Sequence, residues 1–295
     1  MNNFDVIVIG GGPAGISAGI YSHRAGMNVL VLDGGDSKLK QARKLDNYYG
    51  VEGISGSQLV KKGIEQYKNL GGNYINANVV SIKQDMKEHL FEVKTSKELY
   101  FCKSLILCTG SNEKNKTLPE LEDYEGTNVS YCAVCDGFFY KGKTVAVIGD
   151  GDFAINECEE LSRVVEKIYL IAGKEVALPN LKNVEVVNKK IVDVEGENMV
   201  ERLVFEDKTK LAVDGVFVAL GTMSSSDIAK RLGIVGNGGI SVDKNYMTNI
   251  SGVFAGGDAI GGLFQAAKAV SDGAYAGLGA AKYVKMMEFY SDGEE

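Results

Sequence analysis

The chain has 295 residues, 45% of them hydrophobic and 24% charged, which allows about two domains with a core each. The formal net charge of −7 excludes a general nucleic-acid binder, because no basic excess is present to neutralise phosphates. No apolar run approaches a membrane span, the N-terminus lacks a signal-peptide layout, and five cysteines without framework spacing suit a reducing compartment, so we expect a cytoplasmic protein.

The first predicted element is a strand that runs straight into a glycine-rich turn, "VIVIGGGPAG". Gly10 permits the tight turn, Gly12 lets the backbone approach a pyrophosphate, and Gly15 allows close packing of helix on strand. The next strand, "NVLVLD", ends at Asp33, whose carboxylate can accept hydrogen bonds from a ribose diol. The pattern predicts a dinucleotide-binding strand–turn–helix, in preference to a glycine turn that binds nothing.

The same turn returns later in the chain as "VAVIGDGDFA", from Val145 to Ala154. A second echo follows, because "SLILCTG" and "VFVALG" are both buried-strand runs that close on a glycine, Gly110 and Gly221. These repeats predict an α/β fold with two doubly wound, Rossmann-like dinucleotide-binding domains.

Between the two turns lies "YCAVCDGFFY", with Cys132 and Cys135 two residues apart. A structural zinc site needs four ligands, and no second CxxC exists, so we predict a redox pair and no metal site. A CxxC at a helix start can hold a thiolate near neutral pH and exchange through a mixed disulfide. Asp136 then serves as proton donor and acceptor, or as a helix cap, or as both. The other cysteines and both histidines are interpreted as ordinary core or surface residues: Cys102, Cys108, Cys158, His23 and His89.

The second glycine turn departs from a pyridine-nucleotide site. Asp150 places a carboxylate in the turn, where a diphosphate would be repelled, and bulky Phe153 follows. The next strand ends in Ala172, Gly173, Lys174 and Glu175, where an acid or a set of arginines is expected. A single lysine does not replace a planar guanidinium fork.

Near the C-terminus, "GVFAGGDA" is a strand followed by a Gly-Gly-Asp turn, and a long helix rich in small residues comes after it. Asp258 stands at the strand end, and the helix N-terminus points at whatever Asp258 binds. Most of this helix is interpreted as a packing element.

The chain has "GGGPAG", "YCAVCDGFFY" and "GVFAGGDA" in this order. With these motifs it resembles the low-molecular-weight thioredoxin reductases, which are FAD-dependent disulfide reductases, over essentially its whole length. The resemblance implies an FAD domain from residues 1–113 and 246–295, an inserted redox-disulfide domain at 117–242, and hinges at "SNEKNKT" and "VDKNYMTN". It implies that Cys135 faces the flavin, that Cys132 attacks the thioredoxin disulfide, and that the protein is a homodimer. The residues it places at FAD are Gly10, Gly12, Pro13, Ala14, Gly15, Asp33, Asn47, Thr109, Gly110, Asp258, Gln265 and Ala266.

The same resemblance points to an unusual electron donor. NADPH-using relatives typically carry a His-Arg-Arg run after the strand that here ends at Ala172, and a Pro-Asn after the glycine that here is Gly221. The chain is therefore most similar to the ferredoxin-dependent flavin thioredoxin reductases, in which FAD accepts electrons one at a time. Ferredoxins are usually acidic, and a basic cluster would dock one, although a solvated face explains it equally well: Lys38, Lys40, Arg43 and Lys44.

Three alternatives stay open from the sequence. The first is an NAD(P)H-dependent thioredoxin reductase, or one with another donor such as a second flavin. The second is a redox sensor or binding module without turnover, against which the intact CxxC-Asp argues. The third, a ferredoxin–NADP reductase, normally lacks the cysteine pair.

Overall fold

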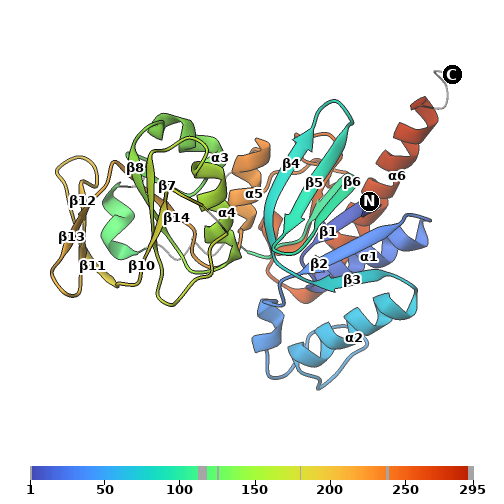
Figure 1. The fold of residues 1–295 in the computed structure, drawn as a ribbon. Helices are drawn as coiled ribbons and strands as arrows, with labels where there is room; N and C mark the ends of the chain where they lie inside the picture. The colour runs from blue at the N-terminus through green and yellow to red at the C-terminus, as the bar shows by residue number, and fades with distance from the viewer. Residues whose placement is uncertain (1, 112–117, 125, 180, 237–238, 292–295) are drawn as a thin grey trace. The chain divides into compact units, whose positions relative to one another are not determined.

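The computed structural model describes residues 2–111, 118–124, 126–179, 181–236 and 239–291. The chain divides into two compact units (Figure 1). The first combines Met1–Asn112 with Ser224–Glu295, and the second is Glu113–Met223.

The first unit is built on a seven-stranded sheet. Five of its strands are parallel and lie in the order β3 (Asn73–Asn76), β2 (Val29–Asp33), β1 (Asn3–Ile9), β6 (Leu99–Leu107) and β15 (Val253–Ala255). In the register, Val6 of β1 pairs with Val29 on one side and with Ser104 on the other. The strand order reverses between β1 and β6, and such a reversal opens a crevice for ligands at the carboxyl ends of the strands. Two more strands, β5 (Leu90–Thr95) and β4 (Val79–Asp85), continue antiparallel from the first half of β6.

Two helices from opposite ends of the sequence, α1 (Pro13–Arg24) and α6 (Ala266–Ser291), pack against each other in this unit. Their contact is made by buried small residues, Ala14 and Ala18 of α1 with Ala276 and Ala280 of α6. Small side chains let the two backbones come close, which explains the Ala- and Gly-rich composition of α6. The third helix, α2 (Gly56–Asn69), begins at Ser55, whose side chain forms a capping box with Gln58.

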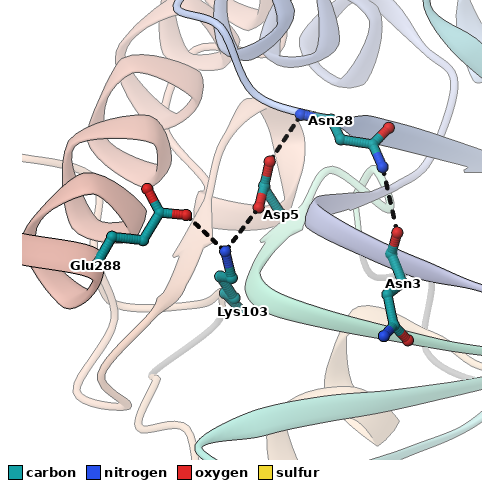
Figure 2. Close-up of polar contacts among 5 residues, drawn as sticks. All are labelled: Asn3, Asp5, Asn28, Lys103 and Glu288. Carbon is teal, nitrogen blue, oxygen red and sulfur yellow. Dashed lines mark hydrogen bonds and ion pairs between the residues drawn. The ribbon is translucent and has the colours of Figure 1, made fainter. Parts of the chain in front are cut away.

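A polar network ties the end of α6 to the sheet (Figure 2). The Lys103 ammonium on β6 lies 2.9 Å from Asp5 Oδ1 and 2.6 Å from Glu288 Oε1. Asp5 Oδ2 accepts a hydrogen bond from the Asn28 backbone N–H, and the Asn28 side chain donates to the Asn3 carbonyl. Segments from three regions of the sequence are therefore fixed to one lysine.

The second unit has a five-stranded parallel sheet in the order β10 (Val184–Val187), β9 (Lys167–Ile171), β8 (Thr144–Ile148), β14 (Gly215–Val218) and β7 (Val129–Ser130). The helix α4 (Asp152–Leu161) follows β8. A small antiparallel sheet, β11 (Ile191–Glu195), β12 (Arg202–Phe205) and β13 (Lys210–Ala212), shares its apolar core. The expected fold class, two doubly wound Rossmann-like units with one inserted in the other, is confirmed.

The second boundary between the units lies near residue 223 and not at 242–246. The helix α5 (Ser225–Leu232) contacts β4 of the first unit, and the backbone N–H of Ile240 donates to the Ala259 carbonyl. The segment expected as a hinge, "VDKNYMTN", is tied into the same unit, because Tyr246 stacks on Tyr275 and donates to Asp272. The other expected hinge, residues 111–117, lies outside the described residues except for Ser111. No helix in the described part of the chain is long and apolar enough to cross a membrane.

Candidate functional site

Four strand ends of the first unit carry the residues predicted to bind a dinucleotide. Gly10 follows β1, Asp33 ends β2, Thr109 follows β6, and Asp258 follows β15 in the 3-10 helix η4 (Gly257–Ile260). All four strands are parallel, so their carboxyl ends lie at one edge of the sheet. Gly10 and Thr109 stand on the two sides of the strand reversal, where a ligand crevice is expected.

The β1–α1 turn is shaped for a phosphate group. Gly10 has a φ of +106°, and a Cβ there would overlap the carbonyl oxygen of Cys108. A Cβ on Gly15 would overlap the Gly10 carbonyl. Gly12 is the N-cap of α1 and has no side chain to occupy the first N–H groups, while Pro13 starts the helix. These N–H groups and the helix dipole are available to a pyrophosphate.

Asp33 is only 4% exposed and is held from three sides. Its Oδ1 accepts hydrogen bonds from the backbone N–H groups of Gly11, at 3.1 Å, and Gly35, at 3.0 Å. The Tyr74 hydroxyl donates to Oδ2 at 2.6 Å. Burial and this carboxylate raise the pKa of Tyr74, so Tyr74 stays a donor. Tyr74 was not predicted from the sequence, where a tyrosine in an edge strand looks like any other strand residue.

Several predicted cofactor residues that are far apart in sequence are joined by hydrogen bonds. The Asn47 side chain donates to Gln265 Oε1 at 2.9 Å, one residue before Ala266 begins α6. The hydroxyls of Thr109 and Ser225 are hydrogen-bonded, and Ser225 also donates to the Gly110 carbonyl at 3.3 Å. Burial raises the pKa of Asp258, although Lys268 and Lys38 oppose the shift. Asn47 is therefore in contact with Gln265, and Thr109 and Gly110 are joined to Ser225.

A lysine that the sequence reasoning missed supports the loop that carries Asp258. Lys268 Nζ donates to the carbonyls of Gly257, at 3.0 Å, and Gly261, at 2.6 Å, and pairs with Asp272 at 2.8 Å. The buried Asp272 in turn accepts from the Gly257 N–H. An acid four residues after a lysine on a helix was the available sequence signal.

Cys132 and Cys135 form a disulfide in the second unit, with their Cα atoms 5.3 Å apart. Cys132 caps the short helix α3 (Ala133–Asp136), and its Sγ accepts the Cys135 N–H at 3.1 Å. Cys132 is 1% exposed, whereas Cys135 is exposed among the apolar side chains of Val134, Phe138 and Phe139. The roles implied for the two sulfurs, Cys135 toward the flavin and Cys132 toward thioredoxin, stay a prediction.

The carboxylate next to this pair is hydrogen-bonded to a serine. The Ser130 hydroxyl donates to Asp136 Oδ2 at 2.6 Å and accepts the Cys132 N–H at 3.1 Å. Asp136 lies inside α3 and so does not act as its N-terminal cap. The three other cysteines are buried thiols with raised pKa values, about 12 for Cys108 and Cys158, because burial disfavours their thiolates.

The glycine turn of the second unit places Asp150 in an ion pair with Lys174, at 3.5 Å. Lys174 lies shortly after the end of β9, the strand end at which the fold's rule places the ribose of a bound nucleotide. Phe153 is 3% exposed and fills the interior behind the turn. The one lysine of this strand end is thus engaged by the acid of the turn.

The basic cluster of the first unit is exposed and partly bonded. Lys38 Nζ donates to Ser111 Oγ at 2.8 Å, Lys40 Nζ donates to the Gly35 carbonyl at 2.5 Å, and Lys44 pairs with Asp46 at 2.9 Å. Two of its members therefore brace loops beside the dinucleotide turn. Among the described residues, no group of three histidine, cysteine or acidic side chains is placed to hold a metal ion.

Comparison with known proteins decides the family. Residues 4–273 match the family model described as pyridine nucleotide-disulphide oxidoreductase. The chain belongs to this family. In its thioredoxin reductases FAD is the cofactor, which fits the cradle at Gly10–Gly15.

Relatives within this family narrow the reaction type. The thioredoxin reductase of Ureaplasma parvum serovar 3 is 34% identical, over 95% of this chain and 97% of that protein. The atypical thioredoxin reductase TRi of Desulfovibrio vulgaris Hildenborough is 34% identical with a TM-score of 0.88, over 96% and 98% of the two chains. A ferredoxin-flavin thioredoxin reductase of Clostridium acetobutylicum is 32% identical with a TM-score of 0.71, over 96% and 99%. The predicted resemblance is confirmed, and the chain is a flavoprotein disulfide reductase of the thioredoxin-reductase type.

Proposed function

We propose that the chain carries electrons from reduced ferredoxin through FAD and the Cys132–Cys135 disulfide to thioredoxin. The observation that supports ferredoxin as the electron donor is the ion pair between Asp150, in the second glycine turn, and Lys174. A pyrophosphate at this turn would meet the Asp150 carboxylate, and a ribose phosphate would have to compete with it for Lys174. The similarity to a ferredoxin-flavin thioredoxin reductase supports the same donor.

In the first unit, the α1 N-terminus would hold the FAD pyrophosphate and Asp33 would accept from the adenosine ribose. Asp258 suits the ribityl chain, while Asn47, Gln265 and Ala266 suit the flavin ring. When bound, FAD supplies the step from single-electron donors to a two-electron acceptor. The remaining predicted contacts are Gly10, Gly12, Pro13, Ala14, Gly15, Thr109 and Gly110.

The reaction balances in two halves. Two reduced ferredoxins deliver one electron each, and with two protons these convert the Cys132–Cys135 disulfide into a dithiol. One thiolate then attacks the thioredoxin disulfide, forming a mixed disulfide and releasing a thioredoxin thiolate that takes up a proton. The second cysteine attacks the mixed disulfide, which restores Cys132–Cys135 and releases reduced thioredoxin. Asp136, whose Oδ2 accepts a hydrogen bond from Ser130, would give and take the protons.

The deciding experiment mixes the flavin-loaded protein anaerobically with reduced ferredoxin, NADPH or NADH and follows the flavin absorbance. We expect full bleaching by ferredoxin, followed by thioredoxin reduction, and little bleaching by either nicotinamide. Cys132→Ser and Cys135→Ser should each abolish thioredoxin reduction while the flavin remains bound. Fast bleaching by micromolar NADPH would contradict the ferredoxin donor.

The second candidate is an NAD(P)H-dependent thioredoxin reductase. The relative named thioredoxin reductase in Ureaplasma parvum favours it, and so does the preserved β8–turn–α4 of the second unit. The homodimer implied by the resemblance stays a prediction, which sedimentation of the flavin-loaded protein would test.

A further inference from the structure

We propose that Glu157 is a positioning residue that opposes ionisation of Cys132 and thereby makes the reduced cysteine pair a stronger reductant. This inference deepens the proposed function and rests on it, because it concerns the same redox pair. Glu157 lies on α4 and is outside the CxxC motif.

The geometry joins Glu157 directly to the disulfide segment. Its Oε2 accepts the backbone N–H of Ala133 at 2.7 Å, and Ala133 is the residue after Cys132. Glu157 is 1% exposed, Ala133 is 5% exposed and Cys132 is 1% exposed. A buried carboxylate therefore occupies the N–H at the first position of α3, next to the sulfur that caps the helix.

Two opposing influences then act on the Cys132 sulfur. The Cys135 N–H, 3.1 Å from Cys132 Sγ, would stabilise a thiolate there, as helix N-termini do in reactive CxxC pairs. A like charge close by in a poorly solvated place disfavours that thiolate. The same carboxylate already acts on a neighbouring thiol, because burial first and Glu157 second raise the pKa of Cys158 to about 12.

Few other titratable groups face this pair from the elements packed against α3. Asp136 belongs to α3 itself and is bonded to Ser130. Tyr140 comes from η3 (Gly137–Tyr140), and its pKa is raised by burial and by Asp136. From α4 come the buried Glu157 and Cys158 and the half-buried Glu159, while Glu160 pairs with Arg163 and Asp152 is exposed. Glu157 is the buried acid among them.

The consequence concerns the redox equilibrium of the pair. A CxxC whose reduced form is stabilised as a thiolate is a strong oxidant, whereas opposing the thiolate makes the dithiol give up its electrons more readily. Two electrons and two protons convert the disulfide into a neutral dithiol, and a Cys132 thiolate forms only when one of these protons leaves. Glu157 acts on that last ionisation alone, so its influence grows with pH.

The test is a redox titration of the flavin-loaded protein against dithiothreitol, comparing wild type with Glu157→Gln from about pH 6 to about pH 10. Glutamine keeps an oxygen acceptor for the Ala133 N–H and removes the charge. At the acid end we expect wild type and Glu157→Gln to have equal equilibrium constants for reduction of the disulfide. At the alkaline end we expect this constant to be about tenfold larger for Glu157→Gln, which equals a difference of about 30 mV in reduction potential. Glu157→Asp keeps the charge and should stay near wild type, and Glu160→Gln on the same helix is the matched control.

A direct readout comes from Cys135→Ser, in which thiolate absorbance reports the pKa of Cys132. Cys108 and Cys158 do not interfere below about pH 10, because their pKa values are about 12. Adding Glu157→Gln should lower the Cys132 pKa by about one unit. No change in this pKa, or a change in redox constant that is the same at every pH, would overturn the inference and leave the proposed function intact. A wild-type pair that dithiothreitol does not reduce would overturn both.

Discussion

At the scale of single residues, the carboxylates of the two sites are oriented in part by side chains that lie outside the motifs. Asp33 is fixed by two backbone N–H groups and the Tyr74 hydroxyl, and Asp136 is fixed by Ser130. A hydrogen bond to a charged group contributes more than one between neutral groups. The partner is therefore expected to matter for cofactor binding or turnover although it touches neither cofactor nor substrate.

Replacing Tyr74 with phenylalanine removes one of the three donors that hold Asp33. We expect FAD to bind about tenfold more weakly, because a hydrogen bond to a carboxylate is worth about 1.5–3 kcal/mol and part of it orients Asp33 for the ribose. Flavin fluorescence during reconstitution of the apoprotein measures this affinity. Tyr67→Phe is the control, since it removes a buried hydroxyl that bonds the Val29 carbonyl in the same unit and should leave FAD affinity unchanged.

Ser130→Ala frees Asp136 from its hydroxyl partner. We expect thioredoxin reduction to slow by about tenfold, less than the roughly hundredfold loss for Asp136→Asn, because proton transfer by a positioned acid contributes about 10²–10⁴ in rate. Steady-state rates with excess reduced ferredoxin measure it. Ser130→Thr keeps the hydroxyl and should restore most of the rate, and a rate for Ser130→Ala equal to wild type would show that the hydrogen bond has no catalytic value.

Sequence predicted the residues whose backbone or chemistry follows a fixed spacing, and it missed those that act through space. Gly10, Gly12 and Asp33 follow from a strand–turn–helix pattern, because the turn leaves little freedom in where they lie. Tyr74 and Glu157 are brought to their partners by strand and helix packing. The local sequence does not distinguish Glu157 from Glu159 and Glu160, which lie on the same helix and are less buried.

At the scale of elements, the two glycine turns show what a Rossmann-like unit keeps when its ligand changes. In both, a glycine is the N-cap of the helix that follows the turn. In both, the strand before the turn has a parallel neighbour on each side. They differ in charge, because the second turn carries Asp150 and is followed by Asp152 in the first turn of α4. Packing preserves the fold while the electrostatics of the turn set which anions bind there.

This difference predicts a gain of function at the ends of β8 and β9. The triple variant Asp150→Gly, Gly173→Arg, Lys174→Arg should bind 2′,5′-ADP, because it removes the acid and adds a pair of guanidinium groups. Position 173 accepts a side chain, since a Cβ there meets no atom within 4 Å. Isothermal titration with 2′,5′-ADP measures the result, and wild type and Asp150→Gly alone should bind at least about tenfold more weakly. Tight binding by the wild type would contradict the reading of this turn.

The network around Lys103 predicts a pH dependence. Burial alone would lower the pKa of Lys103, but hydrogen bonds to Glu288 and Asp5 outweigh it, and the pKa is raised above the ordinary 10.5. A cation with a raised pKa stabilises the folded state fully below pH 10.5, and this stabilisation is lost as the pH rises through the raised value.

Glu288→Gln should therefore reduce the free energy of unfolding by up to about 1 kcal/mol at neutral pH, and the difference from wild type should shrink above pH 10.5. Urea unfolding at several pH values measures it. Lys282→Gln, an exposed change on the same helix, is the control. A difference that stays constant into the alkaline range would assign the effect to packing.

At the scale of the whole molecule, charge opposes the proposed donor. The chain carries a net −7, and an acidic ferredoxin would be repelled unless a local cation patch guides it. Within the basic cluster, Lys38 and Lys40 bond to Ser111 and Gly35 beside the glycine turn. Lys44 pairs with the exposed Asp46, so Arg43 and Lys44 are the members to reverse without disturbing those loops.

Reversing Arg43 and Lys44 to glutamate should slow ferredoxin-driven bleaching by about tenfold at low salt and have little effect at high salt, because the steering field is screened. Stopped-flow absorbance at two ionic strengths measures this. Lys61→Glu with Lys62→Glu, exposed on α2, makes the same charge change elsewhere on the first unit. Equal slowing by both pairs of substitutions would show that the effect comes from net charge and not from docking at Arg43 and Lys44.

The domain order followed from the repeated turns, but the second boundary did not, because α5 has a capping box and a composition that suit either unit. Its contacts with β4 and Thr109 decide where it belongs, and such contacts leave no periodicity in the sequence.

The hydrogen bonds of Ser225 with Thr109 and Gly110 have an evolutionary consequence. They hold together the two points of the first unit from which the intervening chain departs and to which it returns. A segment whose ends meet can be gained, exchanged or redesigned as a cassette, since a short loop would close the host. A change of electron donor in evolution can therefore be made by sequence changes in the inserted segment, while the unit that carries the flavin is kept.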